Sequence, residues 1–390
     1  MATYYVDGSV TSASGSGSGT LGDPWCKTDD LIQYAFTQIA AGSGAGSAGD
    51  TIVVLDGTLT NTARLDPTVW SAGSGSNTQP LWIKAVDPQV TIDWDCGGNE
   101  FIVYPYSAVK LAGFRFYNFT DGGTGYYPFR MYRYISFINC VFDGYAMQHH
   151  GLISISIYSA VIGCKFINDN RYNNTSSQIG YAVQMSTGVF KDNYFETTTT
   201  AGNPYYAFAH GGVHVVNNVF YNTIYYNNGY CVPTQGSRFS NNTFYSDTAT
   251  KMTCIYNPTS YENGNIIDNN YFEGWSNAVN SSTNRMCLEW ITGNKGYDNS
   301  AMFASNLVEN NTTLYDVNDA YFENETLSSS GLVDAANKDF RPTSDLIAKG
   351  FHTQANALPN GSLNVKPNVG AVNGVRPYSF DGQYNPFGGN

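Results

Sequence analysis

Val216-Asn217-Asn218-Val219-Phe220 is one copy of a short pattern that recurs along this chain and decides its fold. Each copy carries Asn or Gly at its bend, and most end on Phe. The third residues of consecutive copies are 24 to 29 positions apart, with a longer step of 36 to the last and weakest copy. The eight copies are 112–116, 138–142, 162–166, 191–195, 216–220, 240–244, 268–272 and 304–308. A repeat of this length, made of short apolar strands and Asn/Gly turns, is typical of a solenoid.

The repeat is too short for a strand pair plus a helix, so one turn of a parallel β-helix is the unit that fits it. Side chains alternate along an extended chain, which places the third and fifth residues of the pattern on one face. The fifth residues should therefore stack inside, one per coil and about 4.8 Å apart. These are Phe116, Phe142, Phe166, Phe195, Phe220, Phe244 and Phe272. The third residues Asn193, Asn218, Asn242 and Asn270 should form a structural amide ladder beside them.

A second series with nearly the same period supports a true repeat. Its members are 181–183, 206–208, 230–232, 253–255 and 286–288, at steps of 25, 24, 23 and 33. This series predicts that Phe208, Val232 and Ile255 occupy equivalent positions on successive coils.

On these residues the chain resembles the right-handed parallel β-helix superfamily, the pectate-lyase-like architecture. Polysaccharide lyases, glycosidases and many bacteriophage tailspike and virion-surface proteins share it. The opening segments 4–8, 22–25 and 49–54 resemble the usual entry into the first coils, and 339–344 with 367–371 resemble the usual close. The resemblance implies an all-β, single-domain, right-handed parallel β-helix.

Three units are expected along the chain. Residues 1–48 would form an entry strand, a loop and a capping helix, residues 49–374 the parallel β-helix, and residues 375–390 an extended C-terminal tail. The helix is predicted over Asp29–Ile39, where apolar residues recur at helical spacing and Asp29 and Asp30 would lie in the first turn. It would cover the open end of the first coils.

Composition limits the partners. The chain has 390 residues, a net charge of −12 and a pI near 4.7, which disfavours nucleic acid and anionic membranes and counts against a polyuronate. No run of 18 apolar residues predicts membrane insertion, and no export signal is visible at the N-terminus. Seven cysteines without CxxC spacing are expected to be reduced, and we expect no metal and no cofactor.

Catalytic motifs of the superfamily are not present in order. His149–Gly151 and His210–Gly212 stand without paired acids, and we interpret them as loop and strand surface. Asp143 and Glu196 each follow a ladder Phe, with one coil between them, so their backbones should lie about 10 Å apart. Two carboxyl groups at about this separation suit inverting glycoside hydrolysis. We nevertheless interpret both as turn residues and favour a role other than an enzyme, because Glu273 occupies the same column.

The function predicted from the sequence is that of a bacteriophage virion structural protein, a capsid decoration or a tail appendage on the particle surface. The aromatic residues of the tail, Tyr378, Phe380, Tyr384 and Phe387, are the expected interface. The expected partners are other virion proteins, further copies of the chain as in a homotrimer, and a cell-surface polysaccharide. Two alternatives stay open: a polysaccharide depolymerase, hydrolase or lyase, and a glycan-binding adhesin without catalysis.

Overall fold

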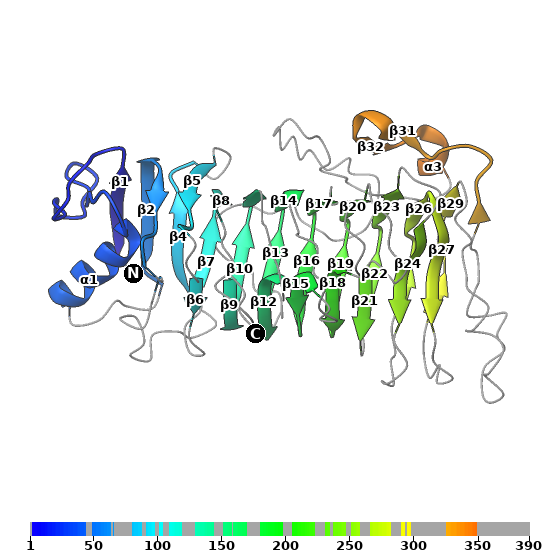
Figure 1. The fold of residues 1–390 in the computed structure, drawn as a ribbon, viewed down its shortest axis with the longest axis horizontal. Coiled ribbons are helices and arrows are strands. Elements are labelled where there is room, and N and C mark those ends of the chain that lie inside the picture. The colour runs from blue at the N-terminus through cyan, green and yellow to red at the C-terminus, as the bar shows by residue number, and fades with distance from the viewer. Residues whose placement is uncertain are drawn as a thin grey trace.

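The chain forms a parallel β-helix in a computed structural model, with strands stacked along one long axis (Figure 1). The structure describes residues 2–43, 49–63, 65, 80–87, 91–97, 101–103, 109–118, 129–143, 151–157, 159–169, 180–197, 205–222, 231–234, 237–246, 251–257, 266–281, 290–292, 295–297 and 325–348. Each full coil contributes one strand to each of three parallel sheets. The β-helix fold predicted from the repeat is confirmed.

We number the three sheets in the order in which the chain passes through them in each coil. Sheet 1 holds β1 (Thr3–Gly8), β2 (Thr51–Gly57), β4 (Leu81–Ala85), β7 (Val109–Ala112), β10 (Ile135–Ile138), β13 (Ser159–Ile162), β16 (Gly188–Lys191), β19 (Val213–Val216), β22 (Arg238–Ser240), β25 (Ile266–Asp268) and β28 (Trp290–Thr292). Sheet 2 holds β3 (Leu59–Thr60), β5 (Ile92–Asp95), β8 (Phe114–Tyr117), β11 (Val141–Asp143), β14 (Lys165–Asp169), β17 (Tyr194–Thr197), β20 (Val219–Asn222), β23 (Thr243–Ser246), β26 (Tyr271–Glu273), β29 (Lys295–Tyr297) and β30 (Glu325–Thr326). Sheet 3 holds β6 (Phe101–Val103), β9 (Phe129–Arg133), β12 (Gly151–Ile157), β15 (Gly180–Met185), β18 (Tyr205–Gly211), β21 (Cys231–Thr234), β24 (Lys251–Asn257) and β27 (Trp275–Ser281).

The bend from sheet 1 to sheet 2 explains the second position of the repeat. Residues there have positive φ, between 52° and 58° at Asn139, Asp192, Asn217, Asn241 and Asn269. Gly113 and Gly163 occupy the same bend in other coils. Asn, Asp and Gly tolerate this left-handed conformation better than other residues, so the bend selects them.

The predicted Phe ladder forms the interior wall of sheet 2. From Phe116 to Phe272 its seven members are paired in register, and each is 0% exposed. Ring centroids of successive members are 4.8 to 6.3 Å apart. The stacking of one ring per coil is therefore confirmed.

The predicted amide ladder is also confirmed. The backbone N and Nδ2 of Asn218 both donate to Oδ1 of Asn242 at 2.9 Å, and the same pair of bonds joins Asn193 to Asn218 and Asn242 to Asn270. Each Nδ2 also donates to a backbone carbonyl of the preceding coil, such as that of Phe190 for Asn218. The buried amides thus satisfy one another and the bend.

The second series is wrong by one residue at Cys231, and wrong again after Ile255, which pairs with Val279 of β27 and not with residues 286–288. Tyr181 pairs with Tyr206 as predicted, but Phe208 pairs with Cys231, and Cys231 pairs with Ile255. The sequence predicts Val232 at the position that Cys231 occupies. A slip of one residue reverses which side chains face inward, and spacing alone does not fix it across loops of unequal length.

The N-terminal helix is present as α1 (Leu31–Ser43), and its apolar residues join the same hydrophobic cluster as the coil interior. It packs against β1 and β3. Asp29 and Asp30 precede the helix and are not in its first turn. Asp30 instead accepts hydrogen bonds from the backbone of Thr62 and Ala63. The outer edge of β1 is paired by the loop, because Tyr5 bonds to Gly19 and Trp25.

After β30 the chain turns back onto the outside of sheet 2. We call residues 327–348 the return segment; it contains the antiparallel hairpin of β31 (Leu332–Asp334) and β32 (Asp339–Pro342), the 3-10 turn η3 (Ala335–Asn337) and α3 (Ser344–Ala348). Figure 1 shows these elements on one side of the stack, beside the C-terminal coils. The predicted boundary at residue 374 and the tail 375–390 lie outside the described residues.

Candidate functional site

The outer face of sheet 2 carries the candidate functional residues. Because ladder Phe side chains point inward, the residues next to them point outward. Two parts of the predicted column are observed: Asp143 pairs with Ile167, and Glu196 is followed by Tyr221, Tyr245 and Glu273. Between Ile167 and Glu196 the register shifts, so the pairing does not join the two parts. This face is open at the N-terminal coils and covered by the return segment at the C-terminal coils.

At the open end, Arg115 of β8 bridges two carboxylates from neighbouring strands. Its Nε and Nη2 donate to Oδ2 of Asp143 at 2.8 and 2.5 Å, and its Nη1 lies 3.3 Å from Oδ2 of Asp93. The side chains of Arg115 and Asp93 are each 41% exposed, and that of Asp143 is 12% exposed. The hydrogen bond to Asp143 raises the pKa of Arg115, so the guanidinium stays charged.

Polar and aromatic groups extend this cluster along the same strands. The Tyr117 ring lies 5.6 Å from Cζ of Arg115. Burial, followed by the charge of Asp95, raises the pKa of Tyr117 and keeps its phenol neutral. Nδ2 of the exposed Asn118 donates to Oδ1 of Asp95 at 2.7 Å. We call Asp93, Asp95, Arg115, Tyr117 and Asn118 the open polar cluster.

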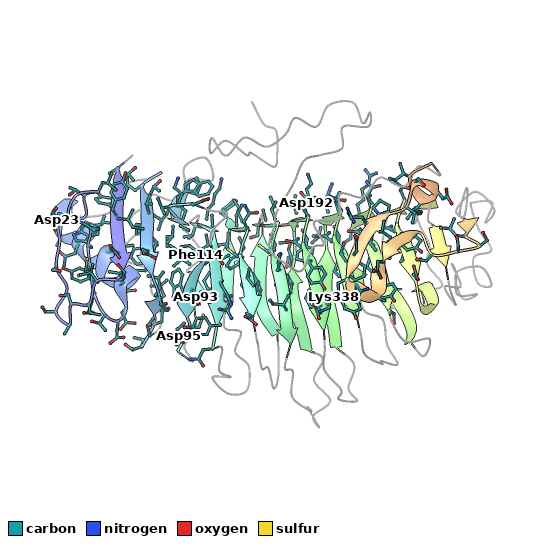
Figure 2. All side chains as sticks on the ribbon, turned by 90° about the horizontal axis from the view of Figure 1, so that it is seen from above. Asp23, Asp93, Asp95, Phe114, Asp192 and Lys338 are labelled. Carbon is teal, nitrogen blue, oxygen red and sulfur yellow. The ribbon has the colours of Figure 1, made fainter. Side chains whose placement is uncertain are left out.

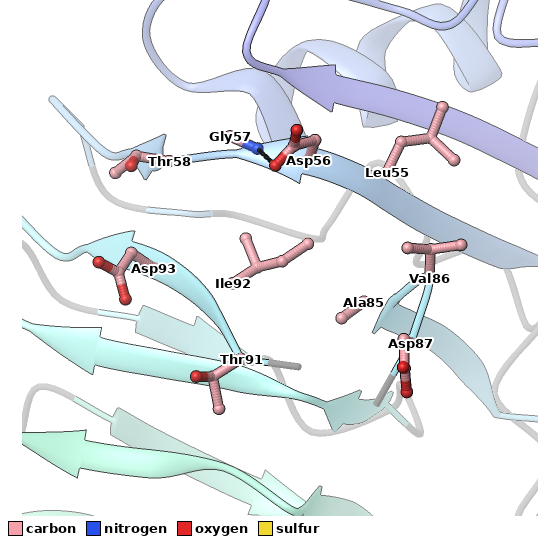
Figure 3. Close-up of a pocket in the computed structure, with 10 residues that line it drawn as sticks. All are labelled: Leu55, Asp56, Gly57, Thr58, Ala85, Val86, Asp87, Thr91, Ile92 and Asp93. Atoms are coloured by element: carbon pink, nitrogen blue, oxygen red, sulfur yellow. Dashed lines mark hydrogen bonds between the residues drawn. The ribbon is translucent and has the colours of Figure 1, made fainter. Parts of the chain in front are cut away.

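A groove of about 350 Å³ adjoins this cluster (Figure 3). It is formed where β2 and β4 end and β5 begins, and Asp93 belongs to both the groove and the open polar cluster. Three carboxylates line it, from Asp56, Asp87 and Asp93. Figure 3 shows these three side chains with apolar Leu55, Val86 and Ile92 between them. The groove therefore combines hydrogen-bond acceptors with apolar side chains.

The two carboxylates considered for hydrolysis do not share an open site. Glu196 is 8% exposed, accepts a hydrogen bond from the Tyr194 hydroxyl at 2.8 Å and pairs with Nζ of Lys338 at 2.7 Å. Asp143 is tied to Arg115. Each carboxylate thus has its own cation, and the return segment lies over Glu196.

Other predicted site residues lie in less described parts of the chain. His149 and His150 and the four aromatic residues of the tail are outside the described residues, as are residues 304–308. His210 is paired with Pro233 within sheet 3, and its side chain is not described. Within the described ranges no group of three or more His, Cys, Asp or Glu could hold a metal ion, and no helix is long and apolar enough to cross a bilayer.

Sequence reasoning missed Arg115, Asp93 and Lys338. The alternation around Phe116 carried a usable signal for Arg115, because a residue next to an inward Phe must point outward. Asp93 lies on the coil before the first repeat copy, and Lys338 is 142 positions from Glu196. The repeat could not place either of them.

No protein-family model and no curated protein matches the chain. Among the solved structures similar to it are three polysaccharide lyases of family PL6. One is an alginate lyase in complex with a trisaccharide, with a TM-score of 0.40 and 12% identity over 76% of this chain and 60% of that one. A second is a point mutant of the alginate lyase AlyGC, with a TM-score of 0.37 and 12% identity over 81% and 55%. A third, specific for mannuronic acid and from human gut microbiota, has a TM-score of 0.31 and 11% identity over 90% and 98%. The chain spans 60% and 55% of the length of the first two. The strand pairing shows that the chain is a parallel β-helix.

Proposed function

We propose that this β-helix is a surface-displayed polysaccharide-binding protein and that its glycan site is the open polar cluster with the adjoining groove. The observation that carries the proposal is the Arg115 bridge between Asp93 and Asp143, placed on an exposed face beside a groove. Fixed donors and acceptors next to an aromatic ring are what a sugar-binding surface requires.

The chemistry of the cluster matches a hydroxyl-rich ligand. Carboxylates accept hydrogen bonds from sugar hydroxyls, a guanidinium donates them, and the Tyr117 ring offers an aromatic surface with a polar end. Asp93 and Arg115 are both 41% exposed, so each keeps accessible surface while their ion pair fixes their orientation. Little conformational entropy would then be lost on binding.

The charge of the site narrows the ligand class. Asp56, Asp87, Asp93 and Asp95 lie in or beside the groove, and the guanidinium of Arg115 is already engaged by carboxylates. A polyuronate would bring further negative charge to this surface and meet repulsion. We therefore assign a neutral or amino-bearing polysaccharide as the ligand.

Binding of soluble polysaccharides to the full chain tests the proposal. Affinity gel electrophoresis should show retardation by a neutral or amino-bearing polysaccharide and none by alginate. Arg115→Gln and Asp93→Asn should each weaken binding at least tenfold, which corresponds to about 1.4 kcal/mol. Arg341→Gln is the matched control, because Arg341 forms a similar pair with Asp339 on the return segment.

Two results would reject the proposal. One is the absence of binding to every neutral and amino-bearing polysaccharide tested. The other is binding that Arg115→Gln and Asp93→Asn leave unchanged. The same samples, incubated and assayed for new reducing ends and for unsaturated products, separate a depolymerase from a protein that only binds. If cleavage is detected, Glu196→Gln should leave it unchanged, and Asp143→Asn should weaken polysaccharide binding without abolishing cleavage at saturating polysaccharide, since we assign Asp143 to the orientation of Arg115.

The placement on a bacteriophage particle is a prediction from the sequence. Mass spectrometry of purified particles would support it by detecting the chain at fixed stoichiometry. Deletion of residues 376–390 should leave the coils folded and abolish incorporation if the tail is the interface.

A further inference from the structure

We propose that the return segment masks a second carbohydrate-binding face on the outside of sheet 2. The face comprises Tyr194, Glu196, Tyr221, Tyr245, Thr243, Tyr271 and Glu273, contributed by the four consecutive strands β17, β20, β23 and β26. We call it the tyrosine face. It extends the proposed function to a second site and rests on contacts that do not involve the open polar cluster.

The tyrosine face has an ordered layout. In one outward column, Glu196, Tyr221, Tyr245 and Glu273 follow one another, so two tyrosines stand between two glutamates. In the next column, the Tyr194 hydroxyl donates to Glu196 at 2.8 Å and the Tyr271 hydroxyl donates to Glu273 at 2.6 Å. Aromatic faces framed by oriented carboxylates are a surface on which a chain of sugar rings can lie.

The return segment occupies this face with groups that resemble those of a ligand. The Phe340 ring lies 5.3, 5.5 and 6.2 Å from those of Tyr221, Tyr245 and Tyr194. Nζ of Lys338 lies 2.7 Å from Glu196, and Oγ of Ser330 donates to Glu273 at 2.8 Å. The segment thus supplies one ring, one cation and one hydroxyl to the groups that would contact a sugar.

One buried hydroxyl indicates that the covered state does not satisfy the whole face. Thr243 is 0% exposed, and its Oγ1 has no hydrogen-bond partner among the described residues. A polar atom buried in this way destabilises the folded state, because it has lost its hydrogen bonds to water. An apolar residue would pack there without that cost. A hydroxyl is useful if the face also meets a ligand that can bond to it.

The segment is attached by a small satellite cluster rather than by the main core. Leu332, Ala335, Phe340 and Leu346 form this cluster with tyrosines of the face and Val219, apart from the interior of the coils. Figure 2 shows Lys338 on the segment, far along the long axis from Asp93 and Asp95. Release of the segment would leave both the coils and the open polar cluster in place.

Variants that open the segment test the inference in the full chain. The double variant Phe340→Ser with Lys338→Ser removes the ring and the cation, and the milder Ser330→Ala with Lys338→Ala removes only polar contacts. Hydrogen exchange over residues 327–348 reports opening, and calorimetry with maltohexaose, cellohexaose and chitohexaose reports binding. We expect at least one probe to bind tenfold more tightly to the opened variants than to the wild type. Arg341→Ser, whose side chain is 60% exposed on the same segment, should change neither signal.

Two further substitutions assign the gain to one site. Tyr245→Ala in the opened background should abolish the gain, whereas Arg115→Gln should leave it intact. If Arg115→Gln removed the gain in affinity, the sugar would bind at the open polar cluster. That result would refute binding at the tyrosine face and leave the proposed function standing. An opened variant that binds no better than the wild type would overturn the inference. The inference would also be overturned if Phe340→Asp left the coils folded and the return segment still did not open.

Discussion

The two ends of the outer face of sheet 2 use the same backbone for different purposes. Near the N-terminus, Asp93 and Arg115 remain 41% exposed and face solvent beside a groove. In the C-terminal coils, Tyr271 and Thr243 in the same sheet are 0% exposed beneath the return segment. The coils are nearly identical inside, so the difference comes from what the outward column carries. A regular interior leaves the exterior free to vary from coil to coil.

The largest effect should come from the interior that both ends share. Asn218→Leu removes the Oδ1 that accepts from the backbone N and Nδ2 of Asn193. The buried backbone N–H of Asn193 then loses its partner, and its Nδ2 keeps only the bond to the Val161 carbonyl. The expected loss is about 4 kcal/mol in the free energy of unfolding. Denaturant titration measures it. Asn241→Gly is the control, because it keeps the positive φ of 55° and lies outside the internal ladder. An unchanged midpoint for Asn218→Leu would rule out the ladder as a source of stability.

Phe340→Ala should separate the two ends. The Phe340 side chain is 0% exposed, and its truncation is expected to lower the stability of the return segment by about 3 kcal/mol. Hydrogen exchange should rise over residues 327–348 and on the tyrosine face, and stay unchanged in β5 and β8. Val333→Ala on the same segment is the control, since Val333 is 51% exposed. Equal loosening of the N-terminal coils would show that the segment is part of one cooperative unit.

Lys338→Met compares a shielded ion pair with an exposed one. Glu196 would lose its cation while its side chain is only 10% exposed, so we expect a loss of about 1–2 kcal/mol, reduced by the partial exposure of Lys338. Arg341→Gln breaks a pair in which Arg341 is 60% exposed, and should lower the stability much less than Lys338→Met does. A double-mutant cycle with Glu196→Gln measures the coupling. Equal losses of stability for the two ion pairs would contradict the inference that the Lys338–Glu196 pair is shielded from solvent.

Asp192→Asn should give the smallest effect and a defined pH dependence. Burial raises the pKa of Asp192 above its ordinary value of 3.8, so the folded state holds its proton more tightly than the unfolded state. The stability that this proton contributes is present below that unfolded value and is lost as pH rises through the folded pKa. Asparagine does not titrate, and it suits the bend and still accepts from Asn217.

The variant should therefore match the wild type at low pH and be slightly more stable than the wild type at neutral pH. Thermal melts at several pH values check this. A gain that is largest at acidic pH would contradict the sign of the shift and would point to the Lys191 contact at 3.6 Å as the dominant interaction.

Local rules read from the sequence were enough to define the coil. Asn, Asp and Gly at the bend, Phe at the fifth position and Asn at the third predicted the inward stack, the amide ladder and the column from Glu196 to Glu273. They did not predict the register shift after Phe166, which interrupts the column between Asp143 and Glu196. The rules are alternation along a strand and the tolerance of a few residues for positive φ. The register of Cys231 escaped prediction because spacing across unequal loops does not fix a strand to one residue.

Which outward residues are exposed and which are paired depends on the three-dimensional fold. Lys338 reaches Glu196 across 142 positions, and Phe340 covers tyrosines from three coils, which no repeat could indicate. Asp93 meets Arg115 because one strand is stacked on the next, and the groove forms where two neighbouring coils bend. A periodic sequence fixes the interior, since every coil must bury the same face. The exterior depends on where nonrepeating segments return, and the physical contacts that set this are long-range.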